Sequence, residues 1–108
     1  MGLVDAVDPD EVAGLVARCR SVARISPGRF GEVATYLPGH RVPGVRLADD
    51  RIEVHVVACW GARVPDVAAE VRAAVAPVTG GVPVDVFVDD VDIPTGTGAA
   101  EVYLPEGG

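Results

Sequence analysis

The sequence contains no lysine, so every residue with a permanent positive side-chain charge is an arginine. Nine arginines stand against sixteen acidic residues, and the formal net charge of the 108-residue chain is −7. Nucleic-acid binding relies on cationic side chains that neutralise phosphates, so a chain this acidic is a poor candidate for it. The charge is uneven, however. Residues 18–46 hold six arginines and one acid, Glu32, a local charge of +5 on which an anionic partner can dock.

Long apolar runs are missing as well. No uninterrupted apolar stretch approaches the roughly 18 residues that a membrane-spanning helix needs. The first residues, MGLVDAVDPDE, lack the basic region and the apolar stretch of a secretory signal. We therefore expect a cytosolic protein, in which the only two cysteines, Cys19 and Cys59, are free thiols.

One stretch, residues 51–78, indicates the fold class. Apolar residues alternate from Ile52 to Trp60 and then recur every three or four residues from Val64 to Val78, which predicts a strand followed directly by a helix. The alternating residues should face the helices: Ile52, Val54, Val56, Ala58 and Trp60. With 108 residues there is room for one domain, which we place at residues 1–93, followed by a flexible or edge-pairing tail at 94–108.

The remaining elements are predicted from residues that typically begin or end helices and strands. Asp8-Pro9-Asp10-Glu11 has the composition of a helix start, and the apolar spacing carries this helix to about Ser21. Residues 45–48 and 51–60 read as a β-hairpin across an Asp-Asp turn, and residues 82–93 as the last strand. Residues 27–44, rich in proline and glycine, should be the irregular region, with a strand or mobile flap at 31–37. The prediction is an α+β two-layer sandwich, in which two helices cover one face of a small, mainly antiparallel sheet of three to four strands, in the order α-β-β-α-β.

No arrangement of residues predicts catalysis, a cofactor or a metal. His55 and Cys59 share a strand face, but four residues of strand separate them by roughly 13 Å, too far for a base to activate a thiol. The four aspartates of residues 85–92 lack the spacing of a calcium loop. Solvated or ion-paired aspartates are the favoured interpretation, with the arginine-rich segment as a partner within one molecule or between copies.

Two other function classes stay open. Gly28-Arg29-Phe30-Gly31 has the GxxG form that in KH domains clamps RNA, although there it lies between two helices. A small-molecule site or enzyme would have to be built on His40, Glu32 and Tyr36 in the irregular segment.

The favoured function is protein contact. The sheet face opposite the helices should show Val57, Cys59 and Phe87, a modest apolar patch through which the chain self-associates or docks on a partner. A sheet edge is a second route, and a covering of this patch by residues 24–44 or by the tail is the alternative. The irregular segment adds Arg29, Phe30 and Tyr36 as candidate contact residues.

Over residues 8–93 the chain resembles the bacterial alkaline shock, or envelope stress response, protein family. The resemblance rests on VPGVRL, on the alternating strand that ends in Trp60-Gly61, on the helix start VPDV and on the final VDVFV. It implies a non-enzymatic cytosolic scaffold that self-associates and gathers at the inner face of the membrane through a membrane-anchored partner. The chain departs from the commoner members by using arginine in place of lysine and by its middle segment, residues 24–44.

Overall fold

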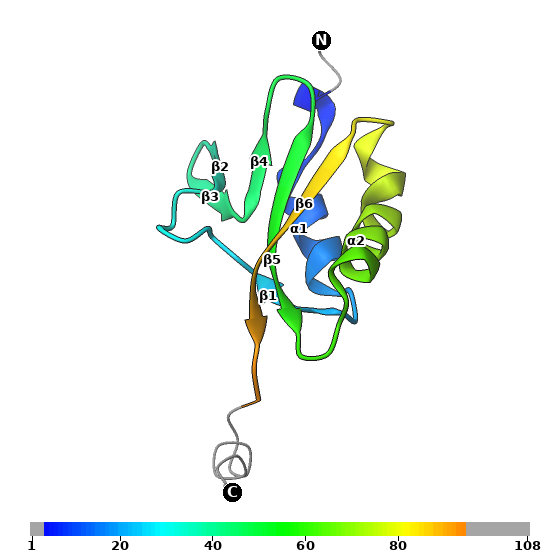
Figure 1. Cartoon of the computed structure of the whole chain (residues 1–108). Helices are drawn as coiled ribbons and strands as arrows, with labels where there is room; N and C mark the ends of the chain where they lie inside the picture. The colour runs from blue at the N-terminus through cyan, green and yellow to red at the C-terminus, as the bar shows by residue number, and fades with distance from the viewer. Residues whose placement is uncertain (1–3, 95–108) are drawn as a thin grey trace, which may run out of the picture.

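The structure, a computed structural model, describes residues 4–94 and has the predicted α+β architecture (Figure 1). In chain order the elements are η1 (Val4–Ala6), α1 (Pro9–Ala17), β1 (Val22–Ile25), β2 (Ala34–Leu37), β3 (His40–Pro43), β4 (Val45–Leu47), β5 (Ile52–Cys59), α2 (Val64–Thr79) and β6 (Val84–Asp92). Both helices pack on one face of the main sheet, so the predicted two-layer arrangement is confirmed. The predicted tail, apart from Pro94, lies outside the described residues.

Strand β5 is the centre of the main sheet. It pairs in parallel with β6 along one edge and antiparallel with both β1 and β4 along the other. Helix α2 connects β5 to β6 and returns the chain to the start of the sheet, which is why these two strands run in the same direction. The parallel pair departs from the mainly antiparallel sheet expected from the sequence.

Strands β1 and β4 are two halves of one sheet edge, and they meet at His55. The backbone amide of Ser26, just after β1, donates to the His55 carbonyl oxygen at 2.9 Å, and the His55 amide donates to the Gly44 carbonyl oxygen, also at 2.9 Å. Residues 27–43 therefore form an insertion between the two halves. Figure 1 shows it standing on the side of β4 away from β6.

Gly44 makes this junction possible. Its φ is +82°, a conformation that side-chain-bearing residues rarely adopt, and a Cβ there would overlap the Ile25 side chain and lie 2.9 Å from the Ser26 carbonyl oxygen. The return from the insertion into β4 thus requires a residue without a side chain.

The second half of the insertion is an ordered hairpin. Its first strand lies within the strand or flap expected at residues 31–37, but the prediction of an irregular segment was wrong for residues 38–43. Strands β2 and β3 pair antiparallel across Pro38-Gly39, and Gly39 has the positive φ, +86°, that such a turn needs. The hairpin is seated on the body by one of its faces. The Thr35 hydroxyl donates to the Val45 carbonyl oxygen at 2.6 Å, and Val42 on the same face is only 3% exposed.

The helices close the core as the periodicity predicts. Asp8 caps α1 by accepting from the Asp10 amide at 2.9 Å, and Gly80, with φ of +61°, ends α2. Helix α1 ends at Ala17, four residues before the predicted Ser21. The fully buried side chains come from both helices and from β4 and β5: Val12, Val16, Val45, Ile52, Val54, Val56, Val67, Val71 and Val75.

Trp60 does not face the helices, contrary to the sequence prediction, and 63% of it is exposed. Strand β5 ends at Cys59, and the Ala62 amide turns back to the Cys59 carbonyl oxygen at 3.1 Å. Gly61, with φ of +85°, lies within that turn. Side chains alternate between the two faces of a sheet only within a paired strand. Trp60 follows the last residue of β5, so the alternation does not fix the direction of its side chain.

Candidate interaction surface

A tight turn at the start of the insertion presents Phe30 to solvent. The Gly31 amide donates to the Gly28 carbonyl oxygen at 3.2 Å, and both glycines have positive φ, +89° and +74°. The Phe30 amide is held by the Glu32 carboxylate at 3.0 Å. Phe30 itself is 85% exposed, the highest value among the large hydrophobic residues that the structure describes. The turn is thus held by hydrogen bonds while its aromatic ring remains free, beside the exposed Arg29.

The outer face of the hairpin carries the second exposed aromatic. Tyr36, 70% exposed, lies directly across from Arg41 in the β2–β3 register. The base of the insertion is fixed through Val33, which is 2% exposed. Its amide donates to the Pro27 carbonyl oxygen at 3.0 Å, and its carbonyl oxygen accepts from Gly44 at 2.8 Å. Of the six candidate contact residues, Arg29, Phe30 and Tyr36 therefore share one insertion that is anchored at its base.

The other three candidates, Val57, Cys59 and Phe87, lie on β5 and β6. Val57 is only 6% exposed, so it offers little surface to a partner. Cys59 is partly exposed and its sulfur donates to the Arg20 carbonyl oxygen at 3.5 Å. Phe87 is 41% exposed and stacks on the His55 ring, with centroids 4.5 Å apart. These residues do not form one continuous apolar patch.

Ion pairs and hydrogen bonds occupy most of this sheet face instead. Arg46 holds Glu53 on the neighbouring strand, with Nε and Oε1 2.9 Å apart. Acidic side chains of β6 are also engaged: Asp85 with Arg51 at 3.3 Å, Asp89 with His55 at 3.0 Å, and Asp92 with Arg24 at 3.3 Å. This face of the sheet is therefore mainly charged, with the Phe87 ring lying among the ion pairs.

Ser26, Asp89 and His55 are the residues closest to a catalytic constellation, but their hydrogen bonds run in the wrong order for one. The Ser26 hydroxyl donates to Asp89 Oδ2 at 2.8 Å, and His55 Nδ1 contacts the same carboxylate. A serine nucleophile needs the imidazole, not the carboxylate, as its hydrogen-bond partner. Ser26 is 5% exposed, whereas the side chains of His55 and Asp89 are 15% and 25% exposed, so the group is a partly buried contact at the junction of β1 and β4.

The residues of the other candidate sites, the GxxG turn and the small-molecule site, do not form the arrangements that those functions need. The GxxG turn lies between strands β1 and β2, whereas a KH clamp lies between two helices. His40 Nε2 is bound to Asp10 at 2.9 Å, while Glu32 binds the Phe30 amide. Within residues 4–94, no group of three or more His, Cys, Asp or Glu side chains could hold a metal ion.

Glu70 of α2 binds the turn that follows α1. Its carboxylate accepts from the Ser21 hydroxyl and from the amides of Arg20 and Ser21, at 2.7 and 3.0 Å. These bonds, with the Ser21 hydroxyl contributing most, lower the pKa of Glu70. Burial, and secondly the charge of Glu70, raises the pKa of the Cys19 thiol. Cys19 is only 7% exposed, so its side chain packs in the core.

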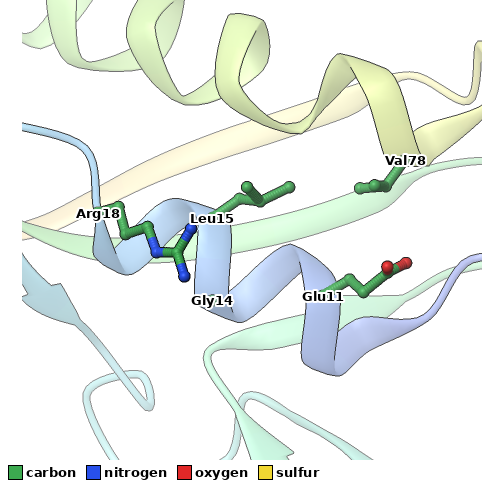
Figure 2. A pocket seen from close by; sticks show the side chains of 5 residues that line it. All are labelled: Glu11, Gly14, Leu15, Arg18 and Val78. Carbon is green, nitrogen blue, oxygen red and sulfur yellow. The ribbon is translucent and has the colours of Figure 1, made fainter.

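A shallow groove runs between the two helices on the far side from the sheet. It has a volume of about 320 Å³ and is formed by Glu11, Gly14, Leu15, Arg18 and Val78. Figure 2 shows Leu15 of α1 and Val78 of α2 pointing toward each other across it. A second hollow, of about 350 Å³, is formed by Val4, Asp5, Leu47, Ala48 and Asp49.

The sequence interpretation missed the exposure of three apolar residues that follow β5 and β6 in the chain. Trp60, Val64 and Ile93 are 63%, 55% and 58% exposed. Cys59 pairs with Asp92, so Trp60 and Ile93 directly follow paired positions of the two strands. Gly61 was the signal that the strand ended here, because a glycine after an aromatic residue permits the turn that exposes it.

Comparisons with known proteins do not identify a family. No protein-family model matches the chain, and no curated protein and no solved structure shows significant similarity to it. Among the described residues, no helix is both long and apolar enough to cross a membrane.

Proposed function

We propose that this protein is a non-enzymatic accessory or scaffold protein of the bacterial cell-envelope stress response. It acts by self-association and by docking on a membrane-anchored partner, which holds it at the cytoplasmic face of the membrane. The assignment to envelope stress follows from the resemblance of residues 8–93 to that family. The contact function is supported by the side chains of the insertion.

The exposure of Phe30 is the observation that carries this proposal. Removing a phenylalanine side chain from water contributes about 1.5–3 kcal/mol, and aromatic and arginine side chains dominate the energy of many protein interfaces. Phe30 and Tyr36 leave this contribution unused in the isolated chain, each with an arginine nearby. The insertion is hydrogen-bonded at its base and packed on the body of the protein. Binding a partner would therefore cost little conformational entropy of the insertion.

Affinity capture from bacterial cells at native expression tests the proposal. Wild-type protein should recover a specific membrane-anchored protein, and the double variant Phe30→Ser/Tyr36→Ser should lose it. Trp60→Ser is the matched control, because it removes another largely exposed aromatic side chain outside the insertion. Recovery that is equal for all three proteins, or a specific set of hits that contains ribosomal and other RNA-associated material only, would contradict the proposal.

A further inference from the structure

The turn Gly28–Gly31, called here the knob, is apolar at its centre and charged on both sides. Phe30 projects from it, Arg29 precedes the ring and Glu32 follows it. Because Phe30 is 85% exposed, it does not occupy any hollow of its own molecule. The knob is therefore available to another surface.

The helix groove also has an apolar middle between two charged residues. Its apolar middle is formed by Leu15 and Val78, with Gly14 leaving space between them. Glu11 and Arg18 lie at its two ends, seven residues apart along α1 and so about 10 Å apart. A volume of about 320 Å³ is at the lower limit for ligand pockets, which suits one side chain better than a whole helix.

We propose that Phe30 of one copy inserts into the α1–α2 groove of a second copy. In this contact Arg29 lies toward Glu11 of the neighbour, and Glu32 lies toward its Arg18. Within residues 4–94, Arg29, Glu11 and Arg18 form no ion pair, so all three charges are available. This inference rests on the self-association contained in the proposed function and specifies how it is achieved.

The knob and the groove are different surfaces of the chain. Two copies can therefore exchange knobs in a closed dimer, or copies can add head-to-tail until a ring closes or an open chain grows. One groove buries little area, which makes each contact weak. Assembly would therefore depend strongly on concentration.

Gly14 permits a test that does not disturb the core. A Cβ at Gly14 meets no atom within 4 Å, so Gly14→Gln fills the groove, and replacing glycine within a helix favours folding. In sedimentation velocity, the mean mass of the wild type should rise with concentration, whereas Gly14→Gln and Phe30→Ser should associate at least about tenfold more weakly. The control Ala17→Gln, at an exposed position of α1 outside the groove, should behave as the wild type.

Charge exchange tests the orientation of the contact. Arg29→Glu and Glu11→Arg should each weaken self-association, and the double variant Arg29→Glu/Glu11→Arg should recover most of it. No recovery in the double variant would overturn the proposed pairing of these two residues.

Mixing two defective variants tests whether the knob of one copy enters the groove of another. Phe30→Ser keeps its groove and Gly14→Gln keeps its knob, so an equimolar mixture should form 1:1 dimers and nothing larger. A mixture that stays monomeric, or a wild type that is monomeric at every concentration, would overturn the inference.

The same variants separate this inference from the proposed partner docking. Gly14→Gln retains Phe30 and Tyr36, so it should still capture the membrane-anchored protein from cells. If the mixture stays monomeric while Phe30→Ser/Tyr36→Ser loses that protein, the contact between knob and groove fails and partner docking stands. If 1:1 dimers form while the double variant still captures the protein, the reverse holds.

Discussion

Replacement of Gly44 by alanine should be among the most destabilising single-methyl changes in this chain. The new Cβ would be held at φ of +82°, in the left-handed region, which costs about 1–2 kcal/mol. It would also overlap the Ile25 side chain and crowd the Ser26 carbonyl oxygen, and such overpacking costs about 1–3 kcal/mol more. The expected loss is about 2–5 kcal/mol, a large part of the about 5–15 kcal/mol that stabilises a typical protein.

Gly39→Ala is the matched control for this change. Gly39 has a similar φ, +86°, but a Cβ there meets no atom within 4 Å, so only the conformational cost of about 1–2 kcal/mol applies. Urea unfolding measures both variants. With a slope of about 1.5 kcal/mol per M, a loss of about 3 kcal/mol lowers the midpoint by about 2 M. Equal losses for Gly44→Ala and Gly39→Ala would refute the junction of β1 and β4 described above.

Two further predictions concern stability. Glu70 has a lowered pKa in the folded protein, so the stabilisation it provides is complete above its unfolded pKa of about 4.3 and is lost as the pH falls through the folded value. The difference in unfolding free energy between wild type and Glu70→Gln should therefore shrink between pH 7 and pH 3. A difference that is constant with pH would contradict the Ser21 contacts. Trp60→Ala should change the free energy of unfolding by less than about 1 kcal/mol, because the side chain is 63% exposed. Val54→Ala, at a fully buried position, should cost about 2 kcal/mol or more by thermal or urea unfolding. A larger loss for Trp60→Ala would mean that Trp60 packs in the core.

The strand-to-helix passage from Ile52 to Val78 was predictable because each element turns a regularly spaced set of apolar residues toward the core. Burial imposes a period of two on a strand and of about 3.6 on a helix, and valine-rich segments show these periods clearly. The hairpin across Asp49-Asp50 was predictable for the same reason, aided by its short turn. In each case a local pattern was sufficient, since the contact partners are close in sequence.

The insertion was harder to predict because its order depends on distant residues. Thr35, Val42 and Gly44 are fixed by contacts with the body of the protein, which the proline and glycine content of residues 27–44 does not reveal. The positive φ at Gly44 and the close approach of Ile25 become visible only when β1 and β4 are placed on the same edge of β5. Strong turn signals were therefore taken as irregularity.

Some residues of the candidate surface were chosen from the sequence. Arg29, Phe30 and Tyr36 were identified from their residue types, and the structure places them on one insertion. Strand alternation put Val57 on the face opposite the helices. The same pattern does not predict whether other residues bury a side chain on that face. The groove between α1 and α2 left no signal in the sequence, because it arises from the distance between two helices and from the missing side chain at Gly14.

Photo-crosslinking at position 30 in living cells tests the contact role of the insertion most directly. A photoreactive phenylalanine analogue would replace Phe30, with the same analogue at Trp60 as the control. The contact function predicts cross-links from position 30 to a membrane-anchored protein and to α1 or α2 of another copy. Cross-links that are absent at position 30, or that match those from position 60, would contradict it.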